Sequence, residues 1–406
     1  MAKLGIDFGS SYCTVAWINP NNEVKTVKFN GDGSVKVPTL IMATSDHLEF
    51  GFFAESILEE VSKMPYNERI EAMADFVPNI KRKLSQDGKV VLHNKEYSHL
   101  DLLKQFFSYL IEESIKDCGN DYNIDSIYIS HPVNWEHSKV ELLCNALKEL
   151  GYPQVETCIE PVAAVKGYCL EHKLIPSDGV LVFDYGGGTT DVAFIKKIGD
   201  TLQVVLPAKG NPYCGGQDID TLLYEQLRKE LLNLKQYDIS QNGIPDIILL
   251  KGCQRLKEMF AGNNNYYSTK LLLNINGKLD TYKFGLSRTN FNNIIIPKVT
   301  EAIDVAKHVV NEATAKHHTI NKILMIGGSS NLTLVKEMLS QLLEDADIIT
   351  SGEKDISVAM GNLAEFNVMT KDKEVSLCEI NNQDCKKSKV VLISPEKAED
   401  VLMFNF

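Results

Sequence analysis

Long apolar runs are absent from this sequence of 406 residues. No stretch approaches the roughly 20 consecutive apolar residues that a membrane-spanning helix needs, so we expect no membrane partner. The chain begins directly with a strand-like run, and no basic segment followed by an apolar one precedes it. We therefore expect no signal peptide and predict a cytoplasmic protein.

The sequence also lacks a basic excess and a metal-binding cysteine pattern. Its formal net charge is −12, whereas a protein that neutralises nucleic-acid phosphates normally presents a basic face. We expect no nucleic-acid partner. The nine cysteines form neither a C-x-x-C pair nor a Cys/His cluster at zinc spacing, so we interpret them as reduced thiols that lie mostly in the core.

Two common nucleotide-binding patterns are missing as well. The chain contains no G-x-x-x-x-G-K-[ST] loop, and no G-x-G-x-x-G turn opens a helix. A composition of 44% hydrophobic and 24% charged residues is nevertheless typical of a globular protein. Because 406 residues exceed the usual size of one domain, we expect two or more lobes, each with its own core.

Apolar periodicity predicts an α/β chain with a repeated strand–turn–strand unit. The first unit covers residues 3–18 and the second covers 180–195, and both share an apolar-Asp-aromatic-Gly pattern with hydroxyls in the turn. We interpret the pair as an internal duplication. Helices are predicted near residues 102–111, 140–150, 218–232, 246–260, 290–315 and 332–342, with strands at 127–129 and 323–326 and a strand pair that turns at Asn276-Gly277.

The two turns carry the chemistry that the sequence offers. Asp7-Phe8-Gly9-Ser10-Ser11 has backbone N–H groups and hydroxyls for an anion and a carboxylate for a metal, although one such copy is more often a plain hairpin turn. The second turn contains Gly186, Gly187 and Gly188 in a row, which weakens a hairpin unless a ligand needs close backbone approach. Together they predict two phosphate-binding hairpins that face each other across a cleft, with carboxylates for a hydrated magnesium ion.

Five motifs in order then carry a family resemblance. They are Leu4-Gly5-Ile6-Asp7-Phe8-Gly9-Ser10-Ser11, Ile159-Glu160-Pro161-Val162-Ala163-Ala164, Val182-Phe183-Asp184-Tyr185-Gly186-Gly187-Gly188-Thr189-Thr190-Asp191-Val192, Gly215-Gly216-Gln217-Asp218 and Gly327-Gly328-Ser329-Ser330. This order resembles the nucleotide-binding domain of the heat shock protein 70 family over about residues 3–368. Five ordered motifs are far more specific than any one of them.

The resemblance implies an α/β actin-like ATPase fold with two duplicated lobes. Each lobe would hold a mixed sheet flanked by helices, and the nucleotide would lie in the central cleft. We expect lobe I at residues 1–175 and lobe II at 176–370, with its final helix returning toward lobe I. Residues 371–406 are expected to form a tail without a complete peptide-binding domain.

The resemblance also implies roles for individual residues. Asp7 and Asp184 match the acids that hold magnesium through water. Lys81 is similar to the lysine that positions the attacking water, although such a basic cluster is more often a solvated helix face and Lys83 is a rival. Glu160 matches the glutamate beside that water, and a helix start is an equally valid reading of Glu160-Pro161. Asp191 matches a carboxylate near the metal and the water.

Further matches concern the nucleotide itself. Thr189 would lie nearest the γ-phosphate, with Ser10 and Ser11 as the other phosphate-contacting hydroxyls. Pro132 looks like a relay to the surface, or simply the end of a strand. The remaining nucleotide-binding positions implied are Gly9, Tyr12, Gly186, Gly187, Gly188, Gly215, Gly216, Lys257, Gly327, Gly328, Ser329 and Asp355, the last of which is otherwise an ordinary acid at a helix N-terminus.

The chain departs from the family pattern mostly around the base. Gln254 replaces an acid, Glu258 replaces a stacking arginine, and Asn331 stands where another arginine is common. Both arginine losses remove cation–π or stacking contacts with adenine, which puts adenine selectivity in question. Val140 falls near an arginine that couples the two halves of family members.

The favoured function is an ATP-driven conformational switch in protein folding or assembly. It would use ATP/ADP and Mg²⁺, and a co-chaperone, a nucleotide-exchange factor or an assembly partner would act with it. The alternatives are a nucleotide-dependent filament or scaffold protein that resembles bacterial actins, and a small-molecule kinase of the same superfamily. The Glu160-Pro161 and Gly215-Gly216 motifs favour the chaperone branch.

The tail leaves two explanations open. Residues 400–406 are an acid followed by an apolar run, which resembles the linker after the family's ATPase domain, so the chain is either cut at that linker or naturally short. We favour the second, because residues 389–394 form a good candidate strand that could pair with 401–404. A β-sandwich of the immunoglobulin type needs roughly 100 residues.

Overall fold

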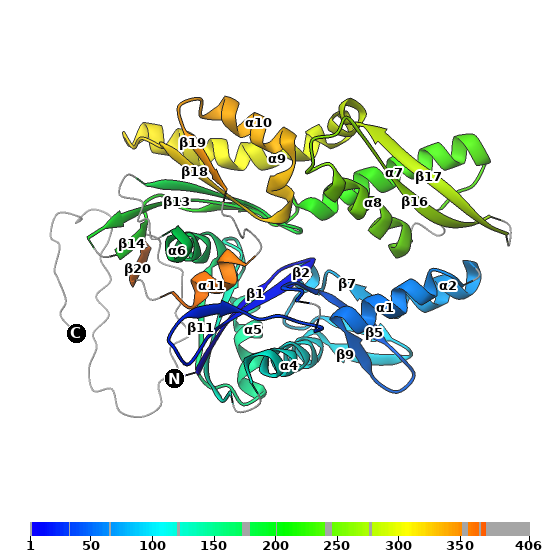
Figure 1. Cartoon of the computed structure of the whole chain (residues 1–406), viewed down its shortest axis with the longest axis horizontal. Coiled ribbons are helices and arrows are strands. Elements are labelled where there is room, and N and C mark those ends of the chain that lie inside the picture. The colour runs from blue at the N-terminus through cyan, green and yellow to red at the C-terminus, as the bar shows by residue number, and fades with distance from the viewer. Residues whose placement is uncertain are drawn as a thin grey trace.

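The computed structural model describes residues 2–31, 33–64, 66–119, 122–172, 179–199, 201–239, 246–275, 278–350, 356–364 and 367–370. They form two lobes that lie one above the other in Figure 1. Each lobe has a mixed sheet with helices packed on it, which confirms the predicted α/β actin-like fold. Across these ranges, no helix is both long and apolar enough to cross a membrane.

Lobe I is built on a sheet with the strand order β11-β10-β1-β2-β3, in which β4 also pairs with β2. The parallel pairs are β1–β10 and β10–β11, and β1–β2 is the antiparallel hairpin that the first repeat predicted. Helices α4 and α5 cover one face. The bounds are β1 (Ala2–Phe8), β2 (Tyr12–Ile18), β3 (Val24–Thr26), β4 (Val37–Pro38), β10 (Ile124–His131), β11 (Val155–Ile159), α4 (His99–Cys118) and α5 (His137–Glu149).

Sequence patterning explains why α4 forms and what it buries. The Ser98 side chain accepts a hydrogen bond from the backbone N–H of Asp101 and so caps the helix. Apolar residues recur with the helical period and are fully buried against the sheet. The buried stripe consists of Leu102, Leu103, Phe106, Phe107, Leu110 and Ile111.

A smaller unit extends lobe I toward the right of Figure 1. Its sheet has the order β6-β5-β7, and a separate hairpin β8–β9 follows. Sequence periodicity did not predict these short elements. Their bounds are β5 (Leu40–Ala43), β6 (Leu48–Phe50), α1 (Gly51–Val61), α2 (Tyr66–Met73), β7 (Phe76–Pro78), α3 (Ile80–Lys83), β8 (Lys89–Leu92) and β9 (Lys95–Ser98).

Lobe II repeats the plan with the strand order β19-β18-β12-β13-β14-β20, and β15 pairs with β13. The β12–β13 hairpin is the second predicted repeat, and the predicted helices appear as α7, α8, α9 and α10. The bounds are β12 (Val180–Tyr185), β13 (Thr190–Ile198), β14 (Thr201–Val204), β15 (Lys209–Asn211), α7 (Gly216–Lys235), α8 (Ile247–Met259), β16 (Tyr266–Ile275), β17 (Lys278–Ser287), α9 (Arg288–Ala315), β18 (Lys322–Ile326), the 3₁₀ turn η1 (Gly328–Asn331), α10 (Thr333–Leu342), β19 (Asp347–Thr350) and β20 (Asn367–Thr370). The predicted turn residues Asn276 and Gly277 lie outside the described residues.

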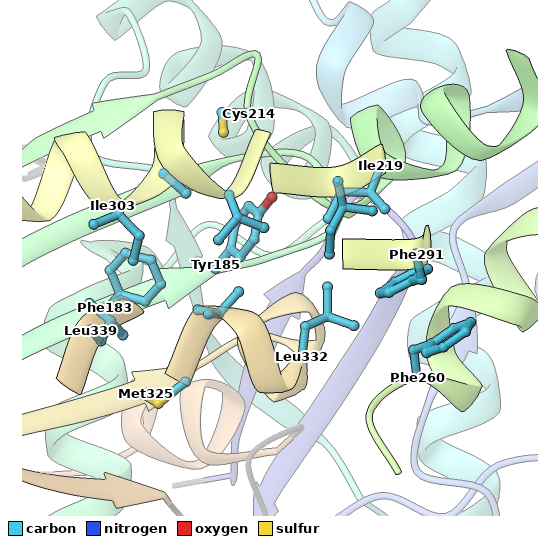
Figure 2. Close-up of a cluster of buried hydrophobic side chains, with 14 of the residues drawn as sticks. Phe183, Tyr185, Cys214, Ile219, Phe260, Phe291, Ile303, Met325, Leu332 and Leu339 are labelled. Atoms are coloured by element: carbon cyan, nitrogen blue, oxygen red, sulfur yellow. The ribbon is translucent and has the colours of Figure 1, made fainter. Parts of the chain in front are cut away.

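The lobe II core lies between its sheet and α9, α7 and α10. Figure 2 shows this cluster, in which Phe183 and Tyr185 from β12 point toward Ile303 of α9 and its neighbours. At the α8 end of the cluster, the rings of Phe260 and Phe291 stack with centroids 3.9 Å apart. The core therefore holds β12, which carries the second glycine turn, and α8 in fixed positions.

Two helices connect the lobes, and they cross each other in close contact where each carries a glycine. Helix α6 (Glu160–His172) packs on β12 and β13 of lobe II, whereas α11 (Ser357–Asn362) packs on β1 of lobe I. A Cβ added at Gly361 would lie 1.7 Å from the carbonyl oxygen of Ala163, and one at Gly167 would lie 1.9 Å from that of Ser357. The backbones thus touch directly, so the crossing requires glycine on both helices.

The lobes also meet far from this crossing. Arg69 of α2 forms an ion pair with Asp246, the residue that caps α8, with 2.7 Å between Nη2 and Oδ2. Both side chains are buried, at 1% and 3% exposure. Ile247 and Ile248 of lobe II pack on an apolar cluster of lobe I that includes Met73. The ion pair and this cluster together form a contact between lobes that we call the α2–α8 contact.

Replacement of Arg69 by Met should strongly destabilise the protein, because it leaves the Asp246 carboxylate buried without its partner. The expected loss is on the order of 3–5 kcal/mol of unfolding free energy, measured by urea denaturation. The double variant Arg69→Met with Asp246→Asn should recover much of this loss, since Asn retains the cap oxygen without the charge. Additive losses would contradict this coupling, and Lys63→Met at the exposed Lys63–Glu60 pair is the control.

Candidate functional site

A cavity of about 360 Å³ lies between the lobes, at the turns of the two repeated hairpins. Its walls come from the β1–β2 turn, the β12–β13 turn, α8 and η1. It is lined by Asp7, Gly9, Ser10, Ser11, Tyr12, Thr14, Lys36, Lys81, Glu160, Asp184, Gly186, Gly187, Gly188, Thr189, Gln254, Lys257, Glu258, Ala261, Ile326, Gly327, Gly328, Ser329, Asn331, Leu332 and Val358.

The two glycine turns contact each other across the cavity. A Cβ added at Gly187 would lie 2.5 Å from Ser11 Oγ, and one at Gly188 would lie 2.2 Å from Ser10 Oγ. Any side chain at these positions would therefore displace the serines. The glycines keep backbone N–H groups and hydroxyls accessible in one small region, which is the chemistry that holds phosphate. We call this region the phosphate end.

Gly215 and Gly216 do not line the cavity, although the resemblance implied a nucleotide contact. They pack behind the second turn: the Gly216 N–H donates to the Gly186 carbonyl at 3.0 Å, and a Cβ at Gly215 would lie 2.5 Å from the Gly188 carbonyl carbon. Lys257 reaches the cavity wall while its Nζ lies 2.8 Å from an Asp220 carboxylate oxygen. The Gly215-Gly216 motif thus supports the phosphate end from outside.

The structure separates the two candidate lysines. Lys81 of α3 is buried, and its Nζ donates to Glu160 Oε1 at 2.6 Å, whereas Lys83 is exposed and lines no part of the cavity. Burial alone lowers the pKa of Lys81, but the carboxylates of Glu160, Asp7 and Asp191 outweigh it, so the net shift is upward. Lys81 therefore carries its charge within the cavity wall.

Around Lys81, the carboxylates of Asp7, Glu160, Asp184 and Asp191 outnumber its one ammonium group. Burial, followed by the charges of Glu160, Asp191 and Asp7, raises the pKa of Asp184. Burial and Glu160 raise the pKa of Asp191 to about 7. Asp191 lies behind the wall instead of lining the cavity, and its Oδ1 accepts a hydrogen bond from the Val133 N–H at 2.8 Å, next to Pro132. Such a site favours an added cation.

Magnesium suits this donor set. Asp7 and Asp184 both line the cavity and supply hard oxygen ligands, and Mg²⁺ commonly keeps several waters and takes one or two carboxylates together with substrate phosphates. Within the described ranges, no group of three or more His, Cys, Asp or Glu residues could enclose a metal. The residues present therefore fit a hydrated ion that is shared with a phosphate.

The opposite end of the cavity, between α8 and η1, differs in chemistry, and we call it the base end. Among its residues, Gln254 Nε2 donates to Glu258 Oε1 at 2.9 Å, and Asn331 lies on the facing wall. No arginine lines the cavity as the described residues define it. Burial and the nearby Glu258 raise the pKa of Tyr12 to about 12, so its hydroxyl stays protonated. Asp355 lies outside the described residues.

Sequence reasoning missed several lining residues. Thr14 is buried in the wall and pairs in register with Asp7 across the β1–β2 hairpin, so strand register was the available signal. Ala261 and Leu332 complete the base end, but only the tertiary arrangement that places α8 and η1 around one cavity brings them there. No local pattern marks such residues.

A glycine-lined cavity between two duplicated lobes defines a nucleotide-binding protein of the actin-like class. The family model described as Hsp70 protein matches residues 3–384, so the chain belongs to the Hsp70 family, whose members are ATPases. Chaperone protein DnaK from Ureaplasma urealyticum serovar 10 is 25% identical over 341 residues, which cover 84% of this chain and 54% of that protein. Chaperone protein DnaK from Thermosipho melanesiensis is 24% identical over 350 residues, with the same coverage of 84% and 54%.

The match covers only part of the length of each relative. Chaperone protein DnaK from Mycoplasmopsis synoviae is 25% identical over 349 residues, 84% of this chain and 55% of that protein. The chain therefore spans about half the length of the curated relatives it matches. The part they share is the ATPase domain of the family.

Binding of a magnesium nucleotide should release protons at pH 6. The folded chain retains the Asp191 proton up to about pH 7, whereas an unfolded chain loses it near pH 4. The nucleotide-free protein therefore loses stability as pH rises from about 4 to about 7. An added cation favours the ionised carboxylates, so affinity should increase between pH 6 and pH 8.

Titration calorimetry in buffers of different ionisation enthalpy would measure these protons. Asp191→Asn should reduce the number released. Equal affinity at both pH values, with no buffer dependence, would contradict the assignment of these carboxylates.

Proposed function

We propose that the chain binds ATP and ADP with Mg²⁺ in the cavity between the lobes and hydrolyses ATP to ADP and phosphate. The observation that carries this proposal is the buried Lys81–Glu160 ion pair beside the two glycine turns. It supplies a fixed positive charge and an acceptor next to the region where both turns offer phosphate ligands. Charge stabilisation of this kind is the main contribution of a protein to phosphoryl transfer.

Each group has a role in this proposal. The N–H groups and hydroxyls of the phosphate end, including Ser10, Ser11 and Thr189, hold phosphate oxygens. Asp7 and Asp184 hold hydrated magnesium, which when bound neutralises phosphate charge. Lys81 and Glu160 orient the attacking water, and Asp191 supports them from behind the wall through its bond to the segment after Pro132.

We further propose that nucleotide state changes the relative position of the lobes. A ligand in the cavity contacts both glycine turns, and these belong to different lobes. The α6–α11 crossing supplies the pivot. The same proposal places the lobe boundaries near residues 175 and 370. It also includes a co-chaperone, an exchange factor or an assembly partner that binds one position of the lobes in preference to the other.

Hydrolysis should depend on Lys81 and not on Lys83. The two lysines lie in the same short helix, but only Lys81 reaches the cavity. We expect Lys81→Ala to slow single-turnover ATP cleavage by about a hundredfold or more, because it removes a charge that acts on the transition state. Lys83→Ala is the matched control and should cleave at the parent rate. The reverse pattern would move the role to Lys83 and refute the assignment.

The peptide clamp of a complete chaperone is not expected in residues 1–406. The last described strand, β20, ends at Thr370, and the 36 residues of 371–406 (406 − 370) are fewer than the roughly 100 that a β-sandwich needs. Their predicted strands at 389–394 and 401–404 lie outside the described residues. Fluorescence anisotropy with labelled unfolded peptides should show no ATP-sensitive binding, and micromolar binding would refute this prediction.

A further inference from the structure

A second, much smaller cavity adjoins the phosphate end. It measures about 20 Å³ and is lined by Ser10, Lys81, Arg82, Trp135, Lys139, Thr189, Pro212 and Tyr213. Three of these residues, Ser10, Lys81 and Thr189, also line the main cavity. The two spaces are thus separated by a wall of three polar side chains, and the small cavity extends from it toward α5 and the loop after β15.

We propose that this second cavity is the route by which inorganic phosphate leaves after ATP cleavage. The inference rests on the proposed hydrolysis. There, the oxygen of water forms a new bond to the γ-phosphorus while the bond to the bridging oxygen breaks. ADP leaves with that electron pair, one proton of the water is released to solvent, and the inorganic phosphate is itself an anion. ADP would still occupy the main cavity at that moment and block the way by which the nucleotide entered. The wall beside Lys81 and Thr189 is the side that ADP leaves open.

The charges along the second cavity suit a departing anion. Lys81 at the wall forms an ion pair with Glu160, and Arg82 forms one with Asp218 at 3.0 Å. Lys139 of α5 is half-buried, and no ion-pair partner exists for its ammonium among the residues that the structure places. The free positive charge therefore lies toward α5, where it attracts phosphate outward instead of holding it at the cleavage site.

Two aromatic residues restrict the passage. The Lys81 Nζ lies 5.7 Å from the centre of the Trp135 ring, and Tyr213 is 70% exposed beside Pro212. A space of about 20 Å³ holds one water and is too small for phosphate. The passage must therefore widen for release. Of the two rings, Tyr213 is free to move because solvent surrounds it.

Phosphate entry into protein already loaded with ADP tests the route directly, because entry and exit follow the same path. Trp135 reports the arrival of phosphate, and Trp17→Phe removes the other tryptophan of the chain. Stopped-flow fluorescence would follow the mixing of inorganic phosphate with the Mg-ADP complex of residues 1–406. We expect Lys139→Gln to slow entry roughly three- to tenfold through the lost attraction, and Tyr213→Ala to accelerate it.

Lys148→Gln changes a lysine at the other end of α5 and is the matched control, with entry at the parent rate expected. Acid-quenched single turnovers measure ATP cleavage, and a fluorescent phosphate sensor measures the release of free phosphate. The rate of cleavage should be unchanged in the Lys139 and Tyr213 variants. Equal entry rates in all variants, or entry only when ADP is absent, would overturn the route. If the protein did not cleave ATP but phosphate entry still depended on Lys139, the proposed hydrolysis would be wrong, whereas the second cavity would remain supported as a passage for phosphate.

Discussion

The architecture depends on a charge imbalance buried where the lobes meet. Asp7, Asp184, Asp191 and Glu160 surround one ammonium, that of Lys81, and burial makes each negative charge costly. In the absence of a cation, the raised pKa values of Asp184 and Asp191 favour protonation, which relieves this imbalance. The Mg²⁺ of the proposed nucleotide complex would relieve it when bound. The two hairpins, their glycines and the surrounding sheets place these groups within reach of a single ligand.

Sequence reasoning worked best where the chemistry is local. The Asp7 and Asp184 turns each lie within a few residues, so their repeated pattern predicts phosphate and metal ligands, and the structure brings both turns to one cavity. The choice between Lys81 and Lys83 could not be made this way, since both lie on one short helix and only tertiary packing decides which is buried. The Gly215-Gly216 motif predicted proximity to the phosphate end, but a motif does not show whether its residues line the cavity or pack behind the turn.

Contacts between residues far apart in the sequence could not be predicted for a related reason. The α2–α8 contact joins Arg69 to Asp246, and neither residue stands out in its own segment. An arginine on a short helix is ordinarily a solvated side chain, and an aspartate before a helix is ordinarily a cap. Asp246 is a cap here, and it also holds the buried charge of Arg69. Local propensity indicates that Asp246 caps a helix, but it cannot indicate that the same carboxylate also pairs with a distant arginine.

In the lobe motion proposed above, the α6–α11 crossing is the pivot. In Figure 1 it lies at one side of the molecule, while α2 lies at the far side of the same lobe. A rotation about the crossing hardly displaces nearby strands but moves α2 through an arc that grows with its distance from the pivot. In that motion, a force at the α2–α8 contact would act on the lobes through a long lever arm. A few side chains at this contact would therefore affect the relative position of the lobes more than the same contacts beside the α6–α11 crossing would.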